Sequence, residues 1–367
     1  MKWFKKQPES GVVSLFTVIF FTILVTVLTV GFVRIMVNER RQSTDQDLTN
    51  RAYYAAESGV EDARRALQQY YPNAADRPKL NADTCDAPVG YNKTIATSPN
   101  VGYSCMLMNL SPPDIQATLP GDGNSMQWAI RSQNDAAFNK IRISWHNLSD
   151  DIDGTNVAFR ATGSPNPTYA NWKNGSGVAY PAMLRMQMFG YPKTGTFGRA
   201  QMEALNKVGF INPTTSPSSG DFPINNMDAN TAPQDTRCTN DSSVFGGYAC
   251  QATVIINPGG LDPSTNYIFL RLKGLYDQNG TKVKIELLNG STVVNTQDGQ
   301  AIVDVTGRAG DVFRRVQSRV SLPGAIDTSL LPEFAIESGD DICKRFELTD
   351  TGESLVAPTD PNGCVVR

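Results

Sequence analysis

The hydrophobic pattern of the chain begins with one uninterrupted apolar run over residues 12–33. These 22 residues contain no charged side chain and no proline. As a helix rising about 1.5 Å per residue, the run would extend roughly 33 Å, enough to cross the ~30 Å hydrocarbon core of a bilayer. Its length and charged flanks disfavour a buried core helix, and Arg34 follows where a secretory signal peptide would have small residues for cleavage. The pattern therefore predicts a membrane-spanning helix.

A second helical pattern follows between residues 48 and 70. Small or apolar residues recur there at steps of three or four, which places them in one stripe along a helix. The stripe consists of Leu48, Ala52, Ala55, Gly59, Ala63 and Ala66. Pro72 cannot donate to the helical ladder and should end the helix. Together the two patterns predict one helix over residues 12–70, about 88 Å long if unbroken, whose second half packs closely on a β-sheet.

Alternating apolar and polar positions predict that the rest of the chain is rich in β-strands. The strand-like stretches are residues 101–108, 126–131, 140–146, 181–189, 266–273, 282–287, 300–305 and 315–322. Ile141, Ile143 and Trp145 share one face of their stretch, and Val283, Ile285 and Leu287 are expected to face the core. The C-terminal stretches are expected to form an antiparallel meander. Residues 200–209 show a brief helical pattern, and residues 211–243, dense in Pro, Ser, Thr and Asn, predict a long surface loop. The expected fold class is therefore α+β, with a long N-terminal helix packed on an antiparallel β-sheet head that has long loops and disulfides.

All the cysteines lie after the apolar run, and each has one near neighbour in sequence. This spacing suggests the pairs Cys85–Cys105, Cys238–Cys250 and Cys343–Cys364, although six cysteines allow fifteen connectivities. The chain has no CxxC motif and a single histidine, so structural disulfides are favoured over a metal site. Lys and Arg are balanced at three on each side of the run and do not decide its orientation. Disulfides persist in oxidising compartments, which predicts that the C-terminal body lies outside the cytoplasm.

The sequence offers little catalytic chemistry. It contains no HExxH, GxSxG or Walker motif and no cysteine with an activating histidine, so we expect neither an enzyme nor a cofactor. Asp150, Asp151 and Asp153 precede a glycine, as in calcium loops, but Ala161 or Thr162 stands where an EF-hand needs glutamate. An ordinary turn is therefore favoured over a looser oxygen-ligand site.

A modest basic group lies near the end of the predicted sheet. It consists of Arg308, Arg314, Arg315 and Arg319. A phosphate-binding or DNA-binding patch is conceivable. However, the chain has a net charge of −3 and a pI of about 5.4, and alternating arginines on an outer strand are usually solvated.

Several of these features occur together in one known family. The basic leader MKWFKKQPESG, the apolar helix and the stretch AYYAAESGVEDARRAL resemble type IV pilins and the pseudopilins of type II secretion. The alanine-rich stretch is similar to X-type minor pilins and K-type pseudopilins, and residues 304–322 look like the last strands of X-type heads. The resemblance implies a lollipop-like molecule that a prepilin peptidase cuts between Gly11 and Val12, methylating the new amino terminus.

The resemblance also implies how the helix assembles. Val12, Leu15, Phe16 and Ile19 would pack against other pilin subunits. Phe16 is the fifth residue of the mature chain, where most pilins carry a glutamate that neutralises a neighbouring amino terminus. Burying that amino-terminal charge without a partner would be costly. The absence of the glutamate therefore favours a minor subunit over a bulk-polymerising one.

These expectations divide the chain into a leader (1–11), a membrane or filament-core helix (12–33), its amphipathic continuation (34–71) and an extracytoplasmic β-rich head (72–367). The favoured function is a minor pilin or pseudopilin, held first in the inner membrane and then in an extracellular filament, with a head for adhesion, filament initiation or contact with DNA or a surface. Its partners would be the membrane, prepilin peptidase and other pilin subunits. Two alternatives remain: a permanently anchored surface protein with a β-sandwich ligand-binding module, and a membrane-tethered hydrolase.

Overall fold

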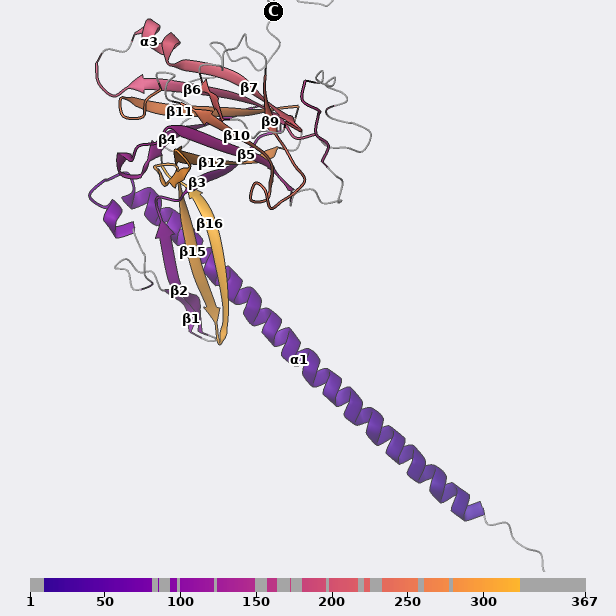
Figure 1. The fold of residues 1–367 in the computed structure, drawn as a ribbon. Coiled ribbons are helices and arrows are strands. Elements are labelled where there is room, and N and C mark those ends of the chain that lie inside the picture. The colour runs from indigo at the N-terminus through magenta and orange to yellow at the C-terminus, as the bar shows by residue number, and fades with distance from the viewer. Residues whose placement is uncertain are drawn as a thin grey trace, which may run out of the picture. The chain divides into compact units, whose positions relative to one another are not determined.

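A single long helix, α1 (Ser10–Tyr70), forms the N-terminal part of the computed structural model (Figure 1). The structure describes residues 10–80, 85, 93–97, 100–121, 124–148, 157–163, 172, 180–195, 198–216, 221–224, 233–256, 261–276 and 280–323. At 61 residues, α1 is about 92 Å long. The predicted joining of the two helical patterns is therefore confirmed, and the helix ends two residues before Pro72.

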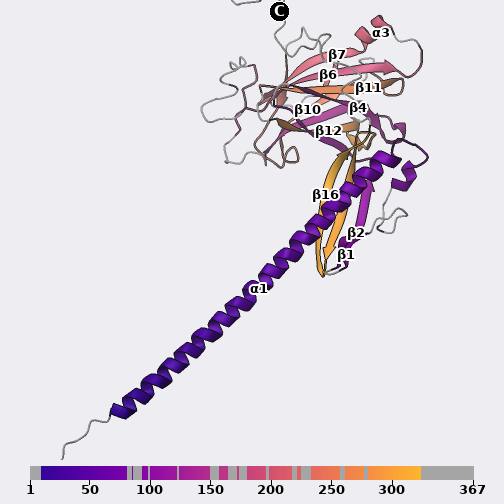
Figure 2. The same ribbon diagram turned by 180° about the vertical axis from the view of Figure 1, so that it is seen from behind.

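The second half of α1 packs on an antiparallel sheet of four strands, seen beside the helix in Figure 2. We call it the helix-bearing sheet. Its strands, in spatial order, are β1 (Lys93–Thr97), β2 (Asn100–Asn109), β15 (Gln300–Ala309) and β16 (Val312–Ser321). The two central strands, β2 and β15, lie far apart in sequence, so the chain between them forms most of the rest of the head.

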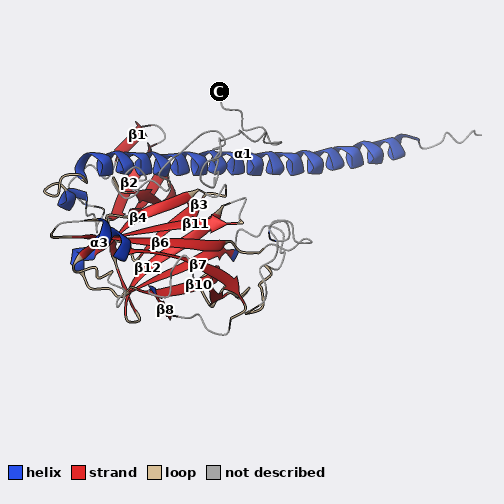
Figure 3. Cartoon of the chain, turned by 90° about the horizontal axis from the view of Figure 1, so that it is seen from above, coloured by secondary structure: helices blue, strands red, loops and turns tan. Residues whose placement is uncertain are grey.

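The other strands form two further sheets that share one hydrophobic core, and their strands are the overlapping red arrows of Figure 3. The first sandwich sheet contains β13 (Thr292–Val294), β12 (Thr281–Asn289), β5 (Lys140–Asn147), β10 (Tyr248–Ile255) and β8 (Asp221–Pro223), with β3 (Asp114–Leu119) also paired to β12. The second sandwich sheet contains β14 (Thr296–Gln297), β4 (Ser125–Ser132), β11 (Asn266–Leu275), β6 (Met183–Pro192), β7 (Asn206–Thr214) and β9 (Gln234–Arg237).

The predicted inner faces of the sandwich strands are confirmed. Ile141, Ile143 and Trp145 of β5 are fully buried, as are Val283, Ile285 and Leu287 of β12. Leu184, Met186 and Met188 of β6 also lie in this core. Together these side chains remove a large apolar area from water, the main favourable term in folding. The head is thus a sandwich of sheets in addition to the sheet that bears the helix, and not the single sheet we expected.

The predicted C-terminal meander is wrong. β11 and β12 follow each other in the chain but belong to different sandwich sheets. Hairpin pairing does occur between β12 and β13 and between β15 and β16. The alternation of apolar and polar residues specifies which side chains of a strand face the core. Two successive strands can both meet that requirement by pairing within one sheet or by lying in two sheets that pack across the core.

The predicted loop over residues 211–243 is also wrong in part, because the end of β7 and all of β8 and β9 lie within it. α3 (Arg199–Ala204) is shorter than the helical pattern suggested, and β7 begins at Asn206. Two parallel pairings, β7 with β9 and β8 with β10, bring polar residues into the sheets. Their side chains are satisfied there: Asn212 donates to Asp235 at 2.7 Å, and Thr236 donates to the Gln251 carbonyl at 2.6 Å.

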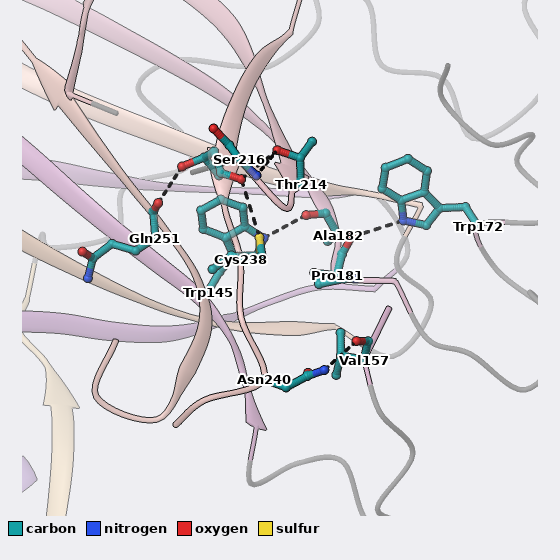
Figure 4. Close-up of a disulfide and its surroundings, with 12 residues drawn as sticks. Trp145, Val157, Trp172, Pro181, Ala182, Thr214, Ser216, Cys238, Asn240 and Gln251 are labelled. Carbon is teal, nitrogen blue, oxygen red and sulfur yellow. Dashed lines mark hydrogen bonds between the residues drawn. A yellow bond between two sulfur atoms is a disulfide. The ribbon is translucent and has the colours of Figure 1, made fainter. Parts of the chain in front are cut away.

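Two of the suggested disulfides are present, Cys85–Cys105 and Cys238–Cys250. Cys238 follows β9 of the second sandwich sheet, whereas Cys250 is on β10 of the first, so this bond links the two sheets (Figure 4). Trp145 lies close by and donates from its indole nitrogen to the Ala182 carbonyl at 2.9 Å. Cys343 and Cys364 lie outside the described residues.

Candidate functional site

The first half of α1 has no packing partner within this chain. Every described residue from 15 to 47 is exposed. Among the residues expected to mediate helix assembly, Leu15, Phe16 and Ile19 are exposed by 62%, 68% and 45%. Burying such side chains is worth about 1.5–3 kcal/mol each, so an apolar segment this long requires an apolar environment outside the chain. We call residues 15–37, where the large apolar side chains are concentrated, the exposed segment.

Three threonine hydroxyls in the uncharged part of the exposed segment, before Arg34, are satisfied within the helix itself. The hydroxyls of Thr22, Thr26 and Thr29 donate to main-chain carbonyls three or four residues earlier, at 2.6–3.0 Å. In an apolar medium an unpaired donor would cost several kcal/mol. The segment can therefore enter hydrocarbon or a bundle of helices despite its threonines. By length and composition α1 is the one described helix suited to cross a membrane.

The second half of α1 is held on the helix-bearing sheet by small residues. All six residues of the predicted stripe lie on the packed side, with Ala52 and Ala63 fully buried. The sequence prediction missed Ala56, Val60 and Leu67, which are also buried. Their one-residue offsets from the stripe widen the apolar face, as is usual for helices that pack on a broad surface. We call residues 48–70 the packed segment.

Glycines on both sides of this contact allow the main chains to approach closely. A β-carbon placed on Gly307 of β15 would lie 2.0 Å from the Ala52 carbonyl oxygen and 2.5 Å from the Ala56 nitrogen. One placed on Gly59 of the helix would lie 2.5 Å from a methyl carbon of Val305. A glycine within the alternating pattern of β15 was the sequence signal for this approach, because an interior strand glycine often marks close backbone contact.

Polar contacts fasten the packed segment along its length. The Tyr103 hydroxyl of β2 donates to Asp62 at 2.9 Å, and Arg314 of β16 donates to the Thr49 hydroxyl at 3.4 Å. Burial, together with the hydrogen bond to Asp62, raises the pKa of Tyr103 well above its ordinary value. The Tyr103 contact is partly buried and the Arg314 contact is exposed, so the first contributes more to holding the helix on the sheet.

A second set of polar contacts secures the end of the helix. Tyr71 donates to the Asp298 carboxylate, which also accepts from Arg77 at 3.4 Å and from Arg131 at 3.1 Å. Burial and the hydrogen bond to Asp298 raise the pKa of Tyr71. These contacts join the end of α1 to Arg131 of β4 in the second sandwich sheet.

The arginine group does not form one patch. Arg314 faces the helix, whereas Arg308, Arg315 and Arg319 lie on the opposite face of the sheet. Arg315 is paired with Asp304, and Arg319 donates to Asp114 at 2.7 Å. The Arg308 guanidinium lies 5.4 Å from the ring centre of Phe313. Because carboxylates already neutralise two of the four cations, this geometry gives little support to an anion site.

The remaining predicted positions are those of the cleavage site and of the aspartate turn. Gly11 and Val12 belong to the first turns of α1, and nothing is described of the side chains there. Asp150, Asp151 and Asp153 lie outside the described residues. Over the described ranges, no group of three or more His, Cys, Asp or Glu side chains could hold a metal ion.

Comparisons with known proteins add no relative. No protein-family model matches the chain, and neither a curated protein nor a solved structure matches it.

Proposed function

We propose that this protein is a minor subunit of a type IV pilus or a related filament, which assembles through the exposed segment of α1 and displays the β-rich head. The observation that carries the proposal is the division of one continuous helix into an apolar half with no partner in the chain and a half locked onto a sheet. A simple membrane anchor does not need a rigid connection of this kind. A filament subunit does, because the position of each head must follow from the position of its helix.

The chemistry of the helix fits this role. Before assembly the exposed segment lies in the bilayer, and after extraction it packs against the same segment of neighbouring subunits, so its apolar side chains stay out of water throughout. Phe16 stands where most pilins place a glutamate, so it offers no carboxylate to neutralise the amino terminus of a neighbouring subunit. This favours a subunit present in few copies, at the tip or along the shaft.

Mass spectrometry of the mature amino terminus tests the proposal. The chain should be expressed with a prepilin peptidase, and membrane and sheared fractions should be analysed separately. We expect an N-terminus at methylated Val12 in both fractions. Replacing Gly11 with leucine should block cleavage and remove the protein from the sheared fraction, while Gly31→Leu should still be cleaved. Retention of Met1 in all fractions would contradict the proposal.

The sandwich architecture favours one alternative, a permanently anchored surface protein with a ligand-binding head. Sandwiches of antiparallel sheets are common scaffolds for extracellular recognition. That protein would keep its leader and stay in the membrane after shearing. The same experiment therefore separates the two functions.

A further inference from the structure

The outer face of the second sandwich sheet carries a group of aromatic side chains. Along β11, Ile268, Leu270 and Leu272 face the core, so Tyr267, Phe269 and Arg271 face outward. Tyr267 pairs across strands with Tyr191 of β6, and Phe269 pairs with Phe189. Tyr267 and Tyr191 are 50% and 48% exposed. Two adjacent tyrosines are thus presented to solvent where β11 begins and β6 ends.

The inner end of this aromatic group is held by a buried polar network. Arg271 donates to Gln127 at 2.8 Å and to Gln187 at 3.3 Å. Its guanidinium also lies 5.0 Å from the ring centre of Phe189. These contacts fix Arg271 and Phe189 on neighbouring strands. At the exposed end of the aromatic surface, the Lys193 ammonium lies 5.8 Å from the ring centre of Tyr267. Binding to this surface would cost little conformational entropy.

A half-open cavity of about 280 Å³ adjoins Tyr267 and Phe269. Its charged lining consists of Arg131, Lys193, Asp135, Asp262 and Asp298. Arg131 is 3.4 Å from Asp135 and 3.1 Å from Asp298, and the Lys193 ammonium is 3.9 Å from Asp135. Two cations therefore face three carboxylates. The cavity offers many donors and acceptors with little net charge.

The backbone next to the cavity is held in an unusual conformation. Asn134 and Asp135 both have positive φ, at 55° and 53°, although neither is glycine. The turn is fixed by a hydrogen bond from the Asn134 nitrogen to Gln297 at 3.1 Å and by one from the Ser132 hydroxyl to the Ala136 carbonyl at 2.6 Å. Such conformations are concentrated at binding sites. Here the turn presents the Asp135 carboxylate at the cavity beside Arg131 and Lys193.

We propose that this cavity and the Tyr191–Tyr267 pair bind an uncharged pyranose ring of a glycan. One face of a pyranose carries apolar C–H groups that stack on an aromatic ring, and its edge carries hydroxyls that both donate and accept hydrogen bonds. The site provides both components side by side. Two cations and three carboxylates leave at most one net negative charge in the lining, which disfavours an anionic ligand. The cavity, at about 280 Å³, is just below the ~300–1,000 Å³ range of ligand pockets, which suits one ring.

Saturation-transfer NMR on the full-length protein tests this proposal independently of filament assembly. The protein should be held in a polyoxyethylene detergent, because detergents with sugar headgroups would compete. The probes are short neutral oligosaccharides of glucose, galactose, mannose and N-acetylglucosamine, with a sialylated oligosaccharide and a mixed peptide pool for comparison. We expect saturable transfer to at least one neutral sugar, strongest at the C–H groups of one ring.

Three variants locate the site. Tyr267→Ala should weaken binding about tenfold or more, whereas Tyr267→Phe keeps the stacking surface and should bind within about threefold of the parent chain. Tyr54→Ala, which removes a tyrosine 65% exposed on α1, should bind normally. No transfer to any neutral sugar, equal binding by Tyr267→Ala and the parent chain, or binding of only the sialylated sugar or peptides would overturn the proposal.

Discussion

At the residue scale, main-chain atoms of α1 leave no room for a side chain at the point where β15 contacts the helix. The space at Gly307 is bounded by the Ala52 carbonyl oxygen and the Ala56 nitrogen, which belong to the helix backbone. A flexible side chain could move away from an added methyl group, but these atoms cannot move without shifting the helix. The helix can therefore lie this close to β15 only because residue 307 is a glycine, which has no β-carbon.

Gly307→Ala should lower the free energy of unfolding of the head by about 3 kcal/mol, because it overpacks the contact against rigid atoms. Chemical denaturation in detergent, followed by tryptophan fluorescence, measures the change. Gly31→Ala is the matched control, since a β-carbon there meets nothing within 4 Å. Identical denaturation midpoints for the two variants would show that the close contact does not exist.

Tyr103 should make the head sensitive to alkaline pH. Its pKa is raised in the folded state, so the unfolded chain loses this proton first, near its ordinary value of 10.0. The stabilisation is therefore fully present below about pH 10 and is lost as the pH rises through the folded-state pKa. Tyr71 should contribute in the same direction.

Thermal unfolding measured between pH 8 and pH 11 checks this expectation. The melting temperature of the parent chain should fall above about pH 10, and that fall should be smaller in Tyr103→Phe, which has no proton to lose. Tyr54→Phe, on an exposed part of the helix, should melt like the parent chain at every pH. A Tyr103→Phe profile parallel to that of the parent would contradict the proposed linkage.

At the element scale, the sequence predicts which face of a helix or strand is buried better than it predicts which strands pair with each other. The helical stripe led to the packed segment because 3.6-residue periodicity marks one side of a helix wherever that side docks. Ile141, Ile143 and Trp145 were recognised as inward facing for the equivalent reason. However, alternation is the same whether a strand's neighbour pairs with it or packs across the core, so β11 and β12 were assigned to one sheet.

The elements that were missed are mostly polar. β9 is Gln-Asp-Thr-Arg, and its stability depends on buried hydrogen bonds such as that from Thr236 to the Gln251 carbonyl. Such partners come from distant segments and leave no local periodicity. The cavity beside Tyr267 was missed for a related reason: its lining combines β4, β11 and the turns before β5, β11 and β15. Only the tertiary structure brings these segments together.

At the scale of the whole molecule, the head should fold without the exposed segment. No described residue from 15 to 47 is buried, whereas Ala52, Ala55 and Ala56 are at most 2% exposed. Deleting residues 1–39 should therefore remove the requirement for detergent while leaving the packed segment whole. Made under oxidising conditions, the shortened chain should be water-soluble and monomeric. In the detergent used for the full-length protein, the two should have the same melting temperature. Deleting residues 1–58 is the comparison, because it also removes the small residues that face Gly307 and should unfold the helix-bearing sheet at a lower temperature. If the two shortened proteins had the same melting temperature, the packed segment would contribute nothing to the stability of the head. The helix would then not be rigidly coupled to the head, which contradicts the proposed mode of filament assembly.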